Sequence, residues 1–218
     1  AEGQPMQWVT PEQLDHIPLP AANRPIVRAI QLPDRYLITP DNDNADLLYS
    51  GVMLAAKQGI HLIQLRAPTL PEKDYWRLAD RLLQELPDTA QLLLKGTPEQ
   101  LALHPRAGWH LTGTQLEQLA GRQHPLPENR LLAASCHSTQ QLELAAALGC
   151  DFATLSPIQP TLSHPDSPAL GWPAAKALAL EAQLPVYFLG GMAPTDIAQA
   201  RDNGAQGIAA IRSLWPSQ

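Results

Sequence analysis

Short apolar runs alternate with longer amphipathic stretches along this chain from Tyr36 onward. Short apolar runs between turn residues are typical of buried strands, whereas apolar positions three and four residues apart are typical of helices. The pattern predicts eight strands, at residues 36–39, 60–66, 91–95, 108–111, 131–135, 151–156, 185–190 and 207–211. The chain is therefore expected to be an α/β protein.

Helix-like stretches fill the intervals between these strands. They begin at Asn44, Pro71, Ser138 and Ala193 among others, and several open with Asn, Ser or Thr and close with Gly, which favour helix ends. Strands and helices that alternate up to eight strands are typical of a (β/α)₈ TIM barrel, which is the predicted fold. A doubly wound open sheet is the alternative.

Two regions break the alternation. Residues 1–34 form an N-terminal extension before the barrel of residues 35–218, and only residues 212–218 follow the eighth strand. The barrel is therefore expected to have a truncated last helix, which exposes apolar strand surface. We expect a short helix at Arg24–Leu32 to cover that gap.

The charge balance narrows the classes of partner. The chain has 15 Lys and Arg against 21 Asp and Glu and no basic cluster, which argues against binding a nucleic acid polymer. No apolar run approaches the ~18 residues of a membrane span, and no leader peptide opens the chain. Cys136 and Cys150 lie inside regular segments, which suits a reduced compartment. We expect a soluble, cytoplasmic protein with no membrane contact.

Polar residues at strand ends are the first candidates for a site. Alternation puts Leu62, Gln64 and Arg66 on one face of their strand. A barrel strand is expected to be apolar on both faces, yet Gln64 and Arg66 lie at its carboxyl end, where TIM-barrel enzymes place their sites. We predict that both bind ligand, and the planar fork of Arg66 suits a phosphate or carboxylate.

Three further strands end in candidate residues. Lys95, which ends the third strand, is interpreted either as a ligand contact or as a solvated residue. His110, in the fourth, is interpreted as a hydrogen-bonded core residue. The fifth ends in Ser135 and continues to His137, which is open to three interpretations: a catalyst, a metal ligand or a histidine that closes a strand.

The last candidates belong to a phosphate site and a loop. Glycine amides after a seventh strand and a helix start after an eighth form the usual phosphate cradle of TIM barrels. Residues 156–173 form a long connection, which is typical of a lid or binding loop. The residues assigned to these features are Gly190, Gly191, Arg212 and Ser213 for the phosphate, and Thr161, Ser163 and His164 for the loop. No metal site and no cofactor are predicted, because carboxylates are missing from the ends of strands two to five and no zinc spacing occurs.

Four motifs together resemble the thiamine phosphate synthase and thiazole tautomerase superfamily, the TenI-like barrels, over residues 35–215. They are Ile-Gln-Leu-Arg, Ser-Cys-His-Ser, Ser-Pro-Ile-Gln-Pro-Thr and Leu-Gly-Gly-Met-Ala-Pro, in that order. The synthase branch uses Mg²⁺ and carries Glu-Lys after Gln-x-Arg, Asn-Asp after the third strand and Asp after the fourth. Here Ala67 and Pro68 follow Arg66, Gly96 follows Lys95, and Thr112 lies in the place of the acidic stretch.

The tautomerase branch requires one phosphate site and one acid/base, which the resemblance places at His137 in the Ser-x-His-Ser motif. The implied reaction is the aromatisation of a carboxythiazole phosphate, with Gly190 and Gly191 holding the phosphate and Arg66, Gln64 or Lys95 facing the carboxylate. Histidine suits this proton transfer because a free imidazole has a pKa of about 6.5. A thiazole tautomerase-like isomerase is the main expectation.

Two alternatives stay open: a transferase of the synthase type with an altered diphosphate site, and a non-catalytic ligand-binding domain. Residues 1–32 carry Glu-Gly-Gln-Pro, Trp8 and Pro-Ala-Ala-Asn-Arg-Pro. They resemble the C-terminal tail of a Nudix hydrolase of the 8-oxo-dGTP diphosphatase type, in which the position of Asn23 contacts the purine. The resemblance implies a parent chain with an attached Nudix hydrolase domain. The expected ligand is a small phosphorylated thiazole-like substrate, and a homo-oligomer is left open.

Overall fold

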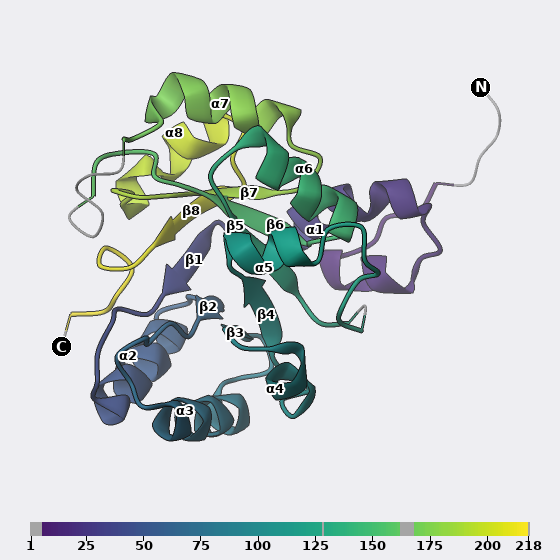
Figure 1. The fold of residues 1–218 in the computed structure, drawn as a ribbon. Helices are drawn as coiled ribbons and strands as arrows, with labels where there is room; N and C mark the ends of the chain where they lie inside the picture. Colours follow the sequence, from purple (N-terminus) through teal and green to yellow (C-terminus); the bar gives the residue numbers. More distant parts are fainter. Residues whose placement is uncertain (1–5, 128, 162–167, 218) are drawn as a thin grey trace.

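The computed structural model describes residues 6–127, 129–161 and 168–217, and its eight parallel strands close into a barrel (Figure 1). The strands follow chain order around the barrel, and β1 pairs with β8, which excludes the open doubly wound sheet. They are β1 (Arg35–Ile38), β2 (Leu62–Gln64), β3 (Gln91–Leu94), β4 (Gly108–Leu111), β5 (Leu132–Cys136), β6 (Phe152–Leu155), β7 (Val186–Leu189) and β8 (Gly207–Ala210). The predicted TIM barrel and its eight strands are confirmed.

Helices follow the first seven strands and lie outside the barrel. Several begin at hydroxyl caps; Thr97 and Thr112, for example, each accept a hydrogen bond from the backbone N–H three residues ahead. The helices are α2 (Ala45–Lys57), α3 (Glu72–Glu85), α4 (Pro98–Ala102), α5 (Gly113–Gln118), α6 (Thr139–Leu148), α7 (Gly171–Glu181) and α8 (Ile197–Asp202), the last preceded by the 3₁₀ turn η3 (Pro194–Asp196). In the described residues none of these helices is long and apolar enough to cross a membrane.

Strand alternation divides the core into two layers. Outward side chains such as Leu37 and Ile63 pack against the helices. Inward side chains fill the barrel, and their centre is an aromatic group in which Phe152 contacts Tyr36 and Tyr187 edge to face, at ring-centroid distances of 5.1 Å and 5.2 Å. The interior is therefore packed with side chains, and a ligand must bind at an end of the barrel.

The N-terminal segment lies across the amino end of the barrel, on the right of Figure 1. It consists of η1 (Pro11–His16), η2 (Ala21–Asn23) and α1 (Arg24–Gln31). Arg28 Nε and Arg24 Nη2 lie 2.7 Å and 3.1 Å from Oδ1 of Asp151, whose carboxylate is fully buried just before β6. Gln206, just before β8, donates to the carbonyls of Ala29 and Leu32.

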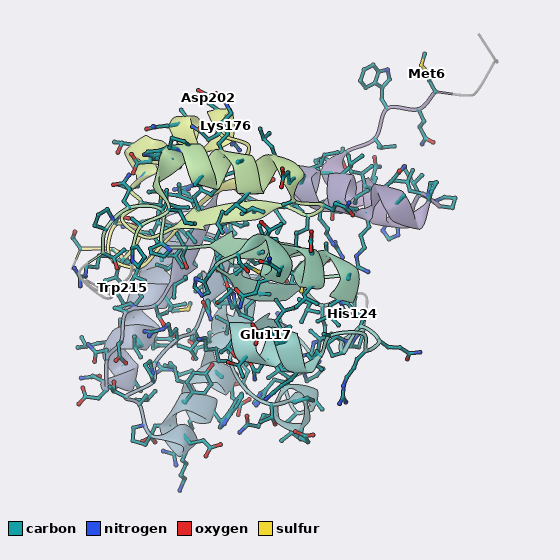
Figure 2. The ribbon with its side chains drawn as sticks, turned by 45° about the horizontal axis from the view of Figure 1, so that its top comes forward. Met6, Glu117, His124, Lys176, Asp202 and Trp215 are labelled. Atoms are coloured by element: carbon teal, nitrogen blue, oxygen red, sulfur yellow. The ribbon has the colours of Figure 1, made fainter. Side chains whose placement is uncertain are left out.

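The expectation that Arg24–Leu32 covers the gap beside the last strand is wrong. Only Leu32, Pro33 and Asp34 separate α1 from β1, so the helix is held at the amino end of the barrel, next to the start of β1. The missing eighth helix is confirmed in the described residues, because the chain after β8 makes a single turn in which Trp215 N–H donates to the Arg212 carbonyl. Trp215, which is labelled in Figure 2, then packs on Gly51 of α2, where an added Cβ would lie 2.0 Å from the indole.

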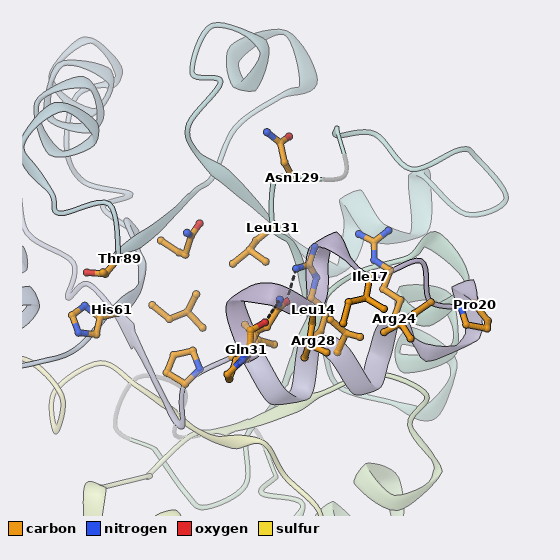
Figure 3. A pocket seen from close by; sticks show the side chains of 17 residues that line it. Leu14, Ile17, Pro20, Arg24, Arg28, Gln31, His61, Thr89, Asn129 and Leu131 are labelled. Carbon is orange, nitrogen blue, oxygen red and sulfur yellow. Dashed lines mark hydrogen bonds between the residues drawn. The ribbon is translucent and has the colours of Figure 1, made fainter. Parts of the chain in front are cut away.

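A cavity of about 990 Å³ lies between the N-terminal segment and the barrel (Figure 3). Its lining includes Leu14 of η1 and Ile17, which directly follows η1. The barrel contributes His61, Gln91 and Leu131, which lie at the amino ends of β2, β3 and β5. This is the face of a TIM barrel that serves stability rather than chemistry. Its size therefore does not make it the candidate active site, which we place at the opposite end.

Candidate functional site

The inward side chains become polar toward the carboxyl ends of the strands. Leu62 is followed on the same face by Gln64, and Phe152 by Thr154. Gln64 is 2% exposed and Thr154 is fully buried, yet Gln64 Nε2 and Thr154 Oγ1 have no hydrogen-bond partner among the described residues. Unpaired buried polar atoms are costly. Both atoms are therefore available to a ligand at this end of the barrel, and their role in binding one stays a prediction.

Two cations lie at the same end of the barrel as Gln64. Arg66 and Lys95 are half-buried at the ends of β2 and β3, and no carboxylate within the described residues forms an ion pair with either of them. Thr39 fixes the Arg66 backbone, since its hydroxyl donates to the carbonyl and accepts from the N–H, both at 2.8 Å. The Tyr75 hydroxyl accepts from Lys95 N–H at 3.0 Å and lies 3.1 Å from the Leu65 carbonyl, which joins the two strand ends.

This pair is suited to bind an anion. Burial, with Arg66 as a second cause, lowers the pKa of Lys95 below its ordinary value. An anion between the two side chains would relieve both effects. A cavity of about 500 Å³ lies next to them, and its lining includes Tyr75, Trp76 and one carboxylate, that of Glu72. The predicted role of Arg66 and Lys95 in ligand binding is consistent with this geometry and stays a prediction.

Anion binding is expected to depend on the charge of Lys95. The lowered pKa means that Lys95 loses its proton at a lower pH than a free lysine, so affinity for inorganic phosphate should decrease as the pH rises through that value. Lys95→Met should weaken binding about 10- to 100-fold near neutral pH, because charge-assisted hydrogen bonds contribute about 1.5–3 kcal/mol. It should also remove the decrease in affinity that the deprotonation of Lys95 causes. Calorimetry from pH 7 to 10 measures both; an unchanged pH profile would contradict the role of Lys95.

His110 is the centre of a buried hydrogen-bonded chain. Its Nδ1 lies 2.7 Å from the Tyr36 hydroxyl, and its Nε2 lies 2.9 Å from Oγ of Ser135. Burial, with Lys95 as a second cause, lowers the pKa of His110 to about 3, so the imidazole is neutral at physiological pH. The interpretation of His110 as a hydrogen-bonded core residue is confirmed, but its partner Ser135 is a half-buried candidate site residue.

His137 is exposed at the rim, directly after β5. Its backbone N–H donates to Gln141 Oε1 at 2.8 Å, and its ring Nδ1 lies 2.7 Å from the Ser156 carbonyl. Because a carbonyl can only accept, Nδ1 carries the proton and Nε2 of the neutral ring is an acceptor. Gln141 is held in turn by Glu117, to which its Nε2 donates at 2.9 Å. The ring is thus fixed with a basic nitrogen available.

The glycines after β7 fit closely against the loop after β6. Gly190 and Gly191 have φ values of 101° and 70°, which favour glycine, and an added Cβ would lie 2.9 Å from Pro157 Cα and 2.7 Å from Gln159 Cβ respectively. Their small size is therefore required for packing. Their role in holding a phosphate stays a prediction.

The usual phosphate cradle lacks its helix start in the described part of this chain, because the residues after β8 form only the turn that ends at Trp215. Arg212 is exposed on that turn, and the Ser213 hydroxyl donates to the Met192 carbonyl at 2.6 Å, so it ties the β8 turn to the β7 loop. Thr161 is half-buried in the long loop. Ser163 and His164 lie outside the described residues.

The donor set does not fit the Mg²⁺ of a synthase. No group of three His, Cys, Asp or Glu side chains that could hold a metal occurs within residues 6–127, 129–161 and 168–217. Lys95 and Thr112 occupy the strand ends where the synthase pattern has carboxylates, and a lysine repels a cation. We derive no step through a metal ion.

Sequence reasoning missed Tyr36 and Thr154 as members of the polar interior, and Gln141 and Glu117 as supports of His137. Alternation puts Tyr36 and His110 on the inward faces of β1 and β4, but these strands are not neighbours in the barrel, so strand pairing does not indicate their contact. The support of His137 gave a weaker signal, a Gln three residues after the cap Ser138.

Comparisons with known proteins agree with this fold. A sequence profile described as thiamine monophosphate synthase matches residues 35–214. A putative thiamine-phosphate synthase 2 of Aquifex aeolicus is 31% identical over 184 residues, which cover 84% of this chain and 97% of that protein. A putative thiamine-phosphate synthase of Geobacter sulfurreducens is 33% identical over 187 residues, with coverages of 82% and 85%. The structure of thiamine phosphate pyrophosphorylase from Pyrococcus furiosus, 19% identical with a TM-score of 0.64 over 87% of each chain, shares the fold. The Nudix resemblance of residues 1–32 stays a prediction.

Proposed function

The chain belongs to the thiamine monophosphate synthase family, and from this premise we propose that its barrel binds a small phosphorylated thiazole and isomerises it. The observation that carries this proposal is His137, whose Nδ1 is hydrogen-bonded to the Ser156 carbonyl while Nε2 is an acceptor at the exposed rim. A neutral imidazole held in this way is a general base with a defined direction.

The reaction requires one proton to move twice. His137 Nε2 takes the proton from the ring carbon of a carboxythiazole phosphate tautomer, and the resulting imidazolium returns it to the exocyclic carbon, which leaves an aromatic thiazole. The Ser156 carbonyl stabilises the imidazolium through the Nδ1 proton. Arg66 and Lys95 hold the carboxylate, and the amides at Gly190 and Gly191 hold the phosphate. No other reactant is consumed.

The second candidate is the synthase reaction, which joins a pyrimidine diphosphate to a thiazole phosphate. The names of the relatives from Aquifex aeolicus and Geobacter sulfurreducens favour this transferase over the isomerase. The strand ends of this chain disfavour it, because Lys95 and Thr112 replace the metal carboxylates of the synthase pattern and a departing diphosphate would be poorly neutralised.

Two parallel incubations separate these functions. The barrel is mixed with the carboxythiazole phosphate tautomer, and in parallel with the thiazole phosphate, the pyrimidine diphosphate and Mg²⁺, and the products are identified by mass spectrometry. Aromatisation in the first mixture supports the isomerase. Diphosphate release in the second mixture alone would identify a synthase, and binding without either product would identify a non-catalytic ligand-binding domain.

A further inference from the structure

A chain of hydrogen bonds leads from the barrel interior to its mouth, through Tyr36, His110 and Ser135. We propose that Tyr36 and His110 are positioning residues that hold the Ser135 hydroxyl as a hydrogen-bond donor toward an anionic oxygen of the ligand. The inference rests on the proposed function in one respect, since it requires a phosphate- or carboxylate-bearing ligand at this mouth.

Tyr36 sets the direction of the chain. Its side chain is fully buried among Phe152 and Tyr187, and the only acceptor in the described residues that its hydroxyl proton reaches is His110 Nδ1, at 2.7 Å. If Nδ1 carried the imidazole proton instead, two protons would face each other and the Tyr36 O–H would be buried without an acceptor. That arrangement costs about 1–3 kcal/mol. Tyr36 therefore donates, and Nδ1 accepts.

His110 transmits this direction to Ser135. The ring is 1% exposed, and its low pKa excludes the doubly protonated form at physiological pH. With Nδ1 an acceptor, the single proton lies on Nε2 and is donated to Ser135 Oγ at 2.9 Å. If the Tyr36 hydroxyl could donate its proton to another acceptor, it could accept from His110 Nδ1, and the tautomer of His110 would not be determined. Because Tyr36 is buried, no such alternative acceptor is within reach of its proton in the described residues.

Ser135 then has one proton left to donate. Ala133 precedes it on the inward face of β5 and is fully buried, whereas Ser135 is half-buried, so its hydroxyl lies where the packed interior opens to the mouth. No hydrogen bond donated by the Ser135 hydroxyl occurs within the described part of the chain. Because Ser135 Oγ already accepts from His110, the proton points to the ligand side, where Lys95 also favours an anion.

The test compares two buried tyrosines of the same aromatic group. Tyr36→Phe removes the hydroxyl that fixes His110, and Tyr187→Phe is the matched control, because it removes a hydroxyl that donates only to the Pro33 carbonyl at the amino end. Inorganic phosphate is titrated by calorimetry into the intact chain and into the three single variants Tyr36→Phe, Tyr187→Phe and Ser135→Ala. The same titration is made with the two double variants, in which each tyrosine replacement is combined with Ser135→Ala. Imidazole ¹⁵N shifts report the tautomer of His110, and thermal melting checks folding.

The wild type should show His110 neutral and protonated on Nε2 from pH 5 to 8. Ser135→Ala should weaken phosphate binding about 10-fold or more, and Tyr36→Phe about two- to fivefold, with a mixture of His110 tautomers. In the Ser135→Ala background Tyr36→Phe should add nothing, since the two effects act through one hydroxyl. Tyr187→Phe should change neither quantity.

Three results would overturn the inference: a His110 proton on Nδ1 in the wild type, equal phosphate affinities of Tyr36→Phe and wild type, or additive effects of Tyr36→Phe and Ser135→Ala. None of these readouts requires turnover. A barrel that binds phosphate through this chain but converts no thiazole would contradict the proposed reaction and leave the inference standing. Turnover with additive effects would contradict the inference alone.

Discussion

Replacing His137 with Ala is expected to lower the rate of thiazole aromatisation by about 10²- to 10⁴-fold, the usual contribution of a general acid/base. Substrate binding should change little, because the anion contacts at Arg66 and Lys95 are made by other strands. His137→Asn is the more informative variant. Its side-chain amide can still donate to the Ser156 carbonyl, as Nδ1 does now, but it lacks the basic Nε2. His137→Asn should therefore keep the structure of the rim, and its aromatisation rate should fall by the same factor as that of His137→Ala.

His16→Ala is the matched control for these variants. His16 is also exposed, but it lies in η1 at the opposite end of the barrel. Its replacement should leave the rate and the affinity unchanged in the same absorbance assay. Normal turnover by His137→Asn would show that another group moves the proton and would contradict the assignment of His137.

Replacing Asp151 with Ala should cause the largest loss of stability, about 3 kcal/mol in the free energy of unfolding. The fully buried carboxylate pairs with Arg24 and Arg28, and its other oxygen accepts the Leu132 N–H at 2.8 Å. Removing it leaves that N–H unpaired and takes the buried negative charge away from two guanidinium groups. Loss of one member of a buried pair costs about 3–5 kcal/mol, and the value expected here is at the low end of that range because the Arg24 side chain is 34% exposed and can reach water.

Urea unfolding measures this loss against a matched control. Asp88→Ala also removes an aspartate from an arginine, but Asp88 and Arg106 are both exposed, so the change should be within about 0.5 kcal/mol. Equal stabilities of the two variants would show that the N-terminal segment is not anchored to the barrel through Asp151.

The elements that depend on local pattern were predictable from the sequence. The strands and the connecting helices follow from apolar periodicity and cap residues, and alternation placed Gln64 on the inward face. The position of α1 was not predictable in this way, because it depends on Asp151, 123 residues away from Arg28. An ion pair of such separation leaves no periodic signal.

The residues of the candidate site also differ in how far the sequence indicates them. Gln64, Arg66 and Lys95 are polar residues in otherwise apolar segments, so the sequence draws attention to them. The contact of His110 with Tyr36 and Ser135 joins three strands, and depends on which residues face each other across a closed barrel. His110 therefore resembled an ordinary core histidine in the sequence, whereas the folded chain connects it to the mouth.

The central claim is that this barrel moves a proton on a thiazole phosphate without a metal ion, and turnover in EDTA tests it most directly. The carboxythiazole phosphate tautomer is mixed with excess enzyme in EDTA or in Mg²⁺, and aromatisation is followed by absorbance in a single turnover. We predict that the wild type aromatises the tautomer at equal rates in EDTA and in Mg²⁺. The His137→Asn variant should lose this activity in both buffers. No aromatisation in either buffer, together with diphosphate release from the pyrimidine diphosphate only in Mg²⁺, would contradict the claim.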